Sequence, residues 1–208
     1  IDIINQLEYL TQINFYKYGL FGNISKSFID SKLDISLGIR ADEDNFSEGS
    51  KILDNISPRM STSYALTEDR RLKWNSSIGI YFKIPTYTVL GFKDFLGVLT
   101  NRNAKYTKSN HFVTGFDYSL GNASRISIEG FFKQYGNFPV SIVDGVSLAN
   151  KGADFEVLGN ENVITNGKGK TQGIELLFQQ KLTRNFYGIF SYTFFKSCLL
   201  YTSDAADE

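Results

Sequence analysis

Apolar and polar residues alternate with a period of two along much of this chain. The clearest example is 33–42, LDISLGIRAD, in which four aliphatic residues occupy every second position. Such alternation predicts a β-strand with one apolar and one polar face, because successive side chains of a strand point to opposite sides. The pattern recurs, and the strands that it predicts are 16–28, 33–42, 58–66, 72–82, 111–120, 124–135, 171–182 and 186–196.

Short and long connections alternate between these strands. Short turns lie at 30–32, 67–71, 121–123 and 183–185, and long connections lie at 43–56, 83–110 and 136–170. We therefore expect four sequential hairpins, with short turns at one end and long loops at the other. This asymmetry is typical of an outer-membrane barrel, in which Ile and Leu would face lipid and Ser, Gly, Lys, Glu and Arg would face the lumen. Alternation alone also fits a soluble β-sandwich binding module or a lipocalin-like barrel, because the apolar face could meet a second sheet.

Composition removes several other classes of protein. The 22 basic and 22 acidic residues cancel, so the basic excess typical of nucleic-acid binding is missing and we expect no nucleic-acid partner. No apolar stretch reaches 18 residues, which excludes a transmembrane helix. Cys198 and His111 are the only residues of their types, which leaves no disulfide and no metal cluster, and we expect no cofactor.

The motifs that could carry catalysis are weak. The run GKGKT at 167–171 contains the end of a phosphate-binding loop, but Ile164 stands where the first glycine is required. His111, Glu129 and Glu175 fall on the polar faces of their strands, where charged residues ordinarily line a lumen. We therefore expect that the protein is not an enzyme.

Two neighbouring strands carry a more specific sequence signal. The run SPRMSTSYAL at 57–66, followed by WNSSIGIYFKIP at 74–85, resembles a hairpin of TonB-dependent receptors of the Bacteroidetes type. The runs HFVTGFDY at 111–118 and GKGKTQGIE at 167–175 fit the same family, and the resemblance covers 9–197. It implies a bacterial outer-membrane transporter that imports a scarce nutrient, such as a siderophore, glycan, peptide or vitamin, with energy from TonB. The implied partners are outer-membrane lipid, the nutrient ligand, and the TonB complex through a plug domain.

The resemblance also sets the expected domain organisation. Barrels of this family have more strands than eight, so we expect 1–197 to be part of a larger barrel, an all-β, antiparallel, up-and-down sheet that is open and curved. Small inward residues favour this interpretation over a complete small outer-membrane barrel, which must fill its own interior. The plug domain is expected outside this sequence. The final run 198–208, CLLYTSDAADE, matches the translation of a transposon-type sequencing adapter, and we expect it to be foreign to the natural protein.

In such a receptor the long loops catch the ligand. The loops 83–110 and 136–170 provide aromatic surface and a cation, and the candidate ligand contacts are Tyr87, Arg102, Tyr106 and Phe138. Phe92 and Phe155 add aromatic surface in the same loops. Four charged residues with inward parity are expected to pair with the plug domain: Arg59, Arg125, Lys133 and Glu175.

Overall fold

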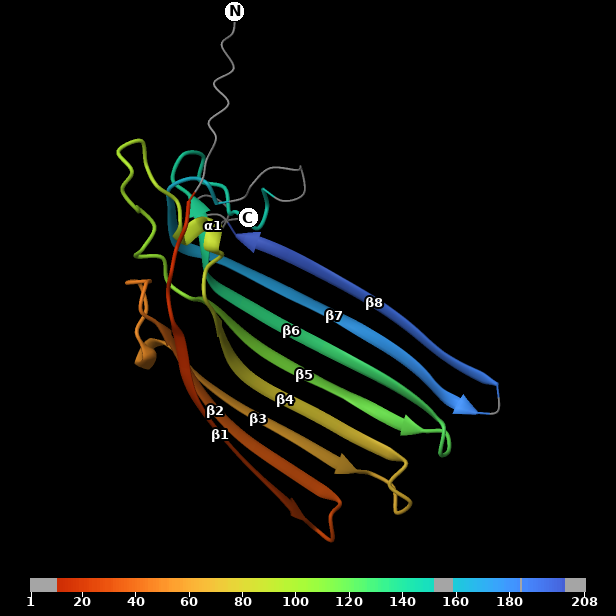
Figure 1. Cartoon of the computed structure of the whole chain (residues 1–208). Helices are drawn as coiled ribbons and strands as arrows, with labels where there is room; N and C mark the ends of the chain where they lie inside the picture. The colour runs from red at the N-terminus through yellow and green to blue at the C-terminus, as the bar shows by residue number, and fades with distance from the viewer. Residues whose placement is uncertain (1–10, 152–158, 184, 201–208) are drawn as a thin grey trace, which may run out of the picture.

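The protein is a single antiparallel sheet of eight strands (Figure 1). The computed structural model describes residues 11–151, 159–183 and 185–200. The strands are β1 (Lys17–Phe28), β2 (Leu33–Asp44), β3 (Ile56–Ala65), β4 (Leu72–Lys83), β5 (Thr107–Ser119), β6 (Ser124–Ser141), β7 (Val163–Thr183) and β8 (Phe186–Leu200). A short 3₁₀ helix, η1 (Ile52–Asn55), precedes β3, and a single turn of α-helix, α1 (Tyr87–Leu90), follows β4.

Each strand pairs with the next strand of the sequence, in the order β1 to β8. β1 pairs only with β2 and β8 only with β7 among the described residues, so the sheet is open. The predicted all-β, up-and-down fold with four hairpins is therefore confirmed. The single open sheet matches neither the soluble β-sandwich nor the complete small barrel. A sandwich needs a second sheet, and a small barrel needs its first and last strands paired.

The strands extend further toward the long-loop end than the sequence pattern predicts. β6 continues past a register irregularity between Tyr135 and Phe138 to pair Ser141 with Val163 of β7. Pro139 lies within this extension, next to a second register shift. A proline lacks the amide hydrogen for a regular ladder and is tolerated in sheets at bulges, which is why the sequence alone suggests a loop here. The connection predicted at 136–170 is thus shortened at both ends by strand, to 142–162.

The last described residues also lie in a strand. Cys198 belongs to β8 and pairs with Lys170 of β7, and 201–208 lie outside the described residues. Whether 198–208 belong to the natural protein stays a prediction.

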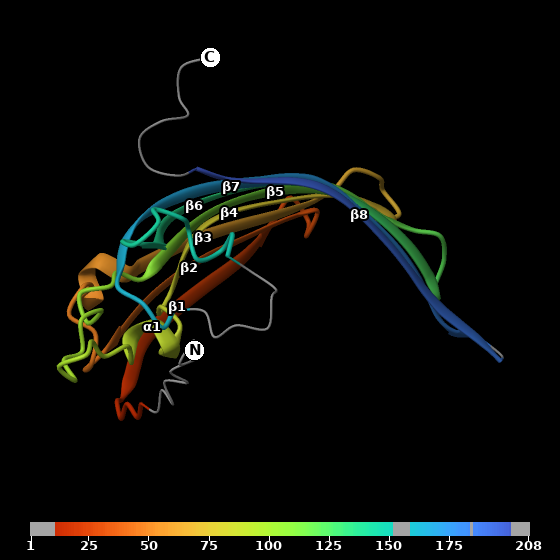
Figure 2. The ribbon, with the colours of Figure 1, turned by 90° about the horizontal axis from the view of Figure 1, so that it is seen from above.

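The two faces of the sheet differ in chemistry and in curvature. One cross-strand row of the apolar face contains Ile24, Leu37, Met60, Ile78, Phe112 and Phe132. Along β5 the three aromatic residues of this parity, Phe112, Phe116 and Tyr118, are exposed, whereas Gly115 of the opposite parity is buried. Side chains crowd on the concave side of a bent sheet and spread apart on the convex side, so the apolar face is convex. Figure 2 shows this curvature from above.

Three polar groups on the convex face are paired within the sheet. The hydroxyl of Thr62 donates to the Asp34 carbonyl oxygen at 3.2 Å, and the hydroxyl of Ser76 donates to the Val113 carbonyl oxygen at 3.2 Å. The Trp74 indole N–H donates to Thr114 Oγ1 at 2.9 Å. An unpaired polar group in hydrocarbon is costly, so these pairings, together with the apolar rows of this face, suit contact with lipid.

A small apolar core lies at the long-loop end of the sheet rather than along it. It is formed by Ile84, Val89, Leu90, Ala104, Tyr106 and Leu148. Loops and α1 therefore gather around one cluster at this end (Figure 1). Among the described residues no helix is long and apolar enough to cross a membrane.

Candidate functional site

Asp44, the last residue of β2, anchors the loops. Its Oδ2 accepts hydrogen bonds from the Tyr106 hydroxyl at 2.7 Å and from Ser47 Oγ at 2.6 Å. Its Oδ1 accepts the backbone N–H groups of Phe46 at 2.8 Å and Ser47 at 2.6 Å. Asp44 and Tyr106 are both fully buried, and burial together with the neighbouring Asp44 carboxylate raises the pKa of the Tyr106 hydroxyl. Tyr106 is thus held as a neutral hydrogen-bond donor.

Arg102 joins two loops that are distant in the sequence. Its Nη2 lies 2.9 Å from Glu48 Oε1, and its Nε donates to the Phe46 carbonyl oxygen at 3.1 Å. The guanidinium also lies 5.3 Å from the centre of the Phe46 ring. Gly49 allows this close approach, because a Cβ there would collide with the Asn103 carbonyl oxygen. Arg102 therefore holds the loop after β2 against the loop after α1.

The other two predicted loop contacts occupy different positions. Tyr87 lies on α1, is 60% exposed, and packs edge-to-face against Phe15 with ring centres 5.5 Å apart. Phe138 lies in β6, with its ring centre 5.4 Å from that of Tyr135, so its placement in a loop is wrong. The reason is the continuation of β6 past its bulge, described above. The preceding residue, Asn137, donates a hydrogen bond from its side-chain amide to the Tyr106 carbonyl oxygen at 3.1 Å.

The four candidate residues thus gather at one end of the sheet. Tyr87 offers its ring to solvent, whereas Tyr106 is enclosed and Arg102 is engaged by neighbouring loops. Phe92 is half-buried, and Phe155 lies outside the described residues. Contact of any of these residues with a ligand stays a prediction. The role of Tyr106 in anchoring the loops was not predicted from the sequence, because its partner Asp44 precedes it by 62 residues.

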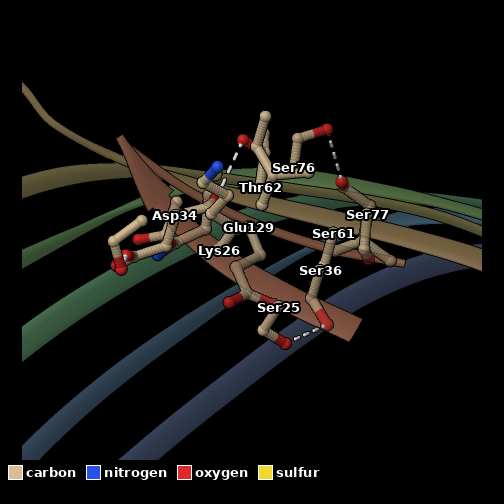
Figure 3. Close-up of a pocket in the computed structure, with 15 residues that line it drawn as sticks. Ser25, Lys26, Asp34, Ser36, Ser61, Thr62, Ser76, Ser77 and Glu129 are labelled. Atoms are coloured by element: carbon tan, nitrogen blue, oxygen red, sulfur yellow. Dashed lines mark hydrogen bonds between the residues drawn. The ribbon is translucent and has the colours of Figure 1, made fainter. Parts of the chain in front are cut away.

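The concave face below the loops carries a polar depression of about 440 Å³ (Figure 3). Short hydroxyl and amide side chains from neighbouring strands form most of it, including Ser25, Ser36, Ser61, Asn75 and Ser77. The hydroxyls of Ser25 and Ser36 are joined by a hydrogen bond of 2.9 Å across β1 and β2. Because these side chains are short and polar, they form a hydrophilic surface that a second polar domain or ligand can approach.

The four inward charged residues that were predicted to pair with a plug domain lie in different environments. Arg125 pairs with Asp117 at 3.4 Å and also donates to Gln179 at 3.1 Å. Glu175 lies directly opposite Glu129 in the β6–β7 register, and neither carboxylate has an ion-pair partner among the described residues. Like charges placed opposite each other repel, so this pair favours a cation from outside the sheet.

The other two cations of the set predicted to pair with a plug, Arg59 and Lys133, lie closer to the loop end. Arg59 stacks on Tyr81, and Tyr81 stacks on His111. His111 Nε2 lies 2.6 Å from Ser109 Oγ, and Lys133 is the register partner of His111. The sequence identified the parity of three of these residues, but their assembly with Tyr81 follows only from the register of four strands.

Comparison with known families settles what this wall is. The model of the family described as TonB dependent receptor-like, beta-barrel matches residues 1–208. The chain belongs to the TonB-dependent receptor family. The resemblance inferred from the sequence is confirmed, and so is the expected localisation, because receptors of this family reside in the bacterial outer membrane. The narrower Bacteroidetes type stays a prediction.

Solved structures support the same fold. The ferric-catecholate import receptor Fiu from Escherichia coli K12 is 13% identical with a TM-score of 0.64, over 91% of this chain and 29% of Fiu. The siderophore receptor PirA from Pseudomonas aeruginosa is 15% identical with a TM-score of 0.61, over 88% of this chain and 34% of PirA. The alcaligin receptor FauA from Bordetella pertussis is 16% identical with a TM-score of 0.57, over 89% of this chain and 30% of FauA.

The receptor wall described here spans about a third or less of the length of these three proteins. No curated protein matches the sequence. The family is one of outer-membrane receptors and transporters, so import of a nutrient is the general function with which this fold is associated. The expectation that the protein is not an enzyme agrees with that family and otherwise stays a prediction.

Proposed function

We propose that this chain forms part of the barrel wall of an active importer. The importer binds a scarce nutrient outside the cell and carries it across the outer membrane with energy transduced by TonB. The observation that supports this proposal best is the division of one curved sheet into an apolar convex face and a polar concave face beneath a cluster of loops. The nutrient belongs to the siderophore, glycan, peptide or vitamin classes.

The partner of the concave face is a plug domain that fills the lumen. The opposed carboxylates of Glu129 and Glu175 support this partner, because a basic side chain from a plug would relieve their repulsion. The hydroxyl-lined depression supports it as well, since short polar side chains leave room for a body inside the barrel. The plug would in turn connect this wall to the TonB complex.

Uptake by bacterial cells that produce the receptor containing this wall tests the proposal. Cells are given radiolabelled nutrients of the four classes, in a host with TonB and in a matched host without it. We expect one class to accumulate inside the cells only when TonB is present, and to be recovered chemically unchanged. Equal uptake in both hosts would identify a passive pore and contradict the proposal.

A further inference from the structure

A stack of cationic and aromatic side chains lies on the concave face, between the polar depression and the loops. The guanidinium carbon of Arg59 in β3 lies 4.5 Å from the ring centre of Tyr81 in β4. The rings of Tyr81 and His111 in β5 have centres 4.5 Å apart and planes inclined by 38°. Lys133 in β6 completes the group as the register partner of His111. We refer to Arg59, Tyr81, His111 and Lys133 as the cation–aromatic cluster.

The register of the sheet explains why these side chains meet. Arg59 pairs with Gly79, Gly79 with His111, and His111 with Lys133. Arg59, Gly79, His111 and Lys133 therefore lie in one cross-strand row. Tyr81 is two residues from Gly79 on the same face, and its ring occupies the space over this glycine. A Cβ at Gly79 would lie 3.1 Å from Tyr81 Cε2 and 3.2 Å from Arg59 Cγ. The absence of a side chain at Gly79 therefore leaves room for the Tyr81 ring between Arg59 of β3 and His111 of β5.

The cluster carries positive charge that no ion pair within the described part of the wall neutralises, although the Asp42 carboxylate interacts electrostatically with Arg59 at longer range. Neither Arg59 nor Lys133 forms an ion pair with a carboxylate of the described residues, whereas Arg125 on the same face has Asp117. The Asp42 carboxylate is engaged by both Nε and Nη2 of Arg40, at 2.6 and 2.8 Å. Glu129 is four residues from Lys133 along β6, a separation of about 13 Å in a strand.

We propose that the cation–aromatic cluster binds the anionic end of the imported nutrient, a carboxylate or other oxyanion attached to a planar ring. The guanidinium of Arg59 presents a planar set of donors that matches an oxyanion, and Lys133 adds a second cation. Tyr81 lies between Arg59 and His111 in the stack, so the outer face of the His111 ring is the aromatic surface on which a planar ring can stack. This inference rests on the proposed import function and adds the chemical class of the ligand.

Binding of three small probes to the full chain in detergent micelles tests the inference. Phthalate carries two carboxylates on a planar ring, cyclohexane-1,2-dicarboxylate has the same charges without the planar ring, and phthalamide has the ring without charge. Saturation-transfer NMR gives the dissociation constant of each. We expect phthalate to bind at least about tenfold more tightly than either analogue, because charge and ring both contribute.

Variants assign this binding to the cluster. Arg59→Gln is expected to weaken phthalate binding about tenfold, which corresponds to the loss of one charge-assisted contact. His111→Leu is expected to remove the preference for phthalate over cyclohexane-1,2-dicarboxylate. Arg125→Gln is the matched control, because it removes an inward cation that already has a partner in the wall, and it should leave phthalate binding unchanged. Unaltered gel mobility of unheated samples shows that each variant folds.

Several results would overturn the inference. Equal binding of phthalamide, equal loss in Arg125→Gln and Arg59→Gln, or normal phthalate binding by Arg59→Gln would each do so. An absence of phthalate binding would also overturn it, and would leave the cations as partners for carboxylates of a plug domain.

The uptake assay separates this inference from the proposed function. If the receptor with Arg59→Gln imports its nutrient at the normal rate in a TonB-dependent way, the import function stands and the ligand assignment fails. If phthalate binding depends on Arg59 but uptake does not depend on TonB, the cluster is an anion site in a protein with a different function.

Discussion

The hydroxyl of Tyr106 donates a hydrogen bond of 2.7 Å to the carboxylate of Asp44, which ties the loop before β5 to the end of β2. Both side chains are fully buried, and Tyr106 also packs in the apolar core of the loop cluster. The same carboxylate accepts two backbone N–H groups of the loop after β2. One buried pair thus fixes two loops over the concave wall, where a ligand would arrive.

The first prediction concerns the hydroxyl of Tyr106. Tyr106→Phe keeps the ring in the core but removes a hydrogen bond to a buried carboxylate, and we expect it to lower the free energy of unfolding by about 2 kcal/mol. Urea unfolding in detergent micelles measures this change. Tyr87→Phe is the matched control, because Tyr87 is 60% exposed and should tolerate the loss of its hydroxyl. An equal effect in both variants would contradict the anchoring role of Tyr106.

The second prediction is the pH dependence of this anchor. Because the pKa of Tyr106 is raised in the folded protein, its hydrogen bond contributes fully below the value of an unfolded tyrosine, about 10. As the pH rises above that value toward the folded pKa, the contribution is lost. We therefore expect the difference in unfolding free energy between the wild-type protein and Tyr106→Phe to be constant from pH 7 to 9 and to shrink above pH 10. A constant difference up to pH 11 would show that Tyr106 is not the titrating group.

The third prediction tests which face meets lipid. Met60 and Ser61 are neighbours on β3 and point to the convex and concave faces. Met60→Lys should cost about 2–4 kcal/mol of stability in a bilayer, since lysine on the lipid face near the middle of a membrane is unfavourable. Ser61→Lys should have little effect on folding into lipid vesicles. The two faces would have to be reassigned if Ser61→Lys proved the more damaging change.

The fourth prediction uses the only tryptophan of the chain. Trp74 lies on the convex face, where its indole N–H is bonded to Thr114. We expect its fluorescence to be blue-shifted and to be quenched strongly in vesicles of brominated lipid. The double variant Trp74→Phe/Ser77→Trp moves the indole to the concave face and should show weak quenching. Equal quenching of the two proteins would contradict the assignment of the convex face to lipid.

The fifth prediction concerns 198–208. If this run derives from a sequencing adapter, its codons will match the adapter, and independent reads of the locus will continue differently after Ser197. Reads that encode the same residues within a longer gene would show that the run is natural.

Local pattern was sufficient to predict the strands, the hairpins and the chemistry of the two faces. The alternation in β2 requires no information from distant residues, because the pleat of a strand places every second side chain on the same side. Turns were also local, and Asp30 has a positive φ of 50° in the turn that the sequence predicts between β1 and β2. The asymmetry of short turns and long connections then indicated a membrane barrel, and the quoted sequence runs indicated the family.

Only the tertiary structure decided where those strands end and which side chains meet. β6 passes Pro139 because its partner β7 continues the ladder beyond a bulge, and this support is invisible in the sequence of β6 alone. Tyr106 was predicted to contact ligand as a loop aromatic, yet its ring and hydroxyl are enclosed by segments far away in the chain. The stack of Arg59 on Tyr81 likewise depends on the registers of neighbouring strands, in which a shift by one residue would move a side chain to the other face. Periodicity determines the face of each residue, whereas long-range pairing determines its neighbours.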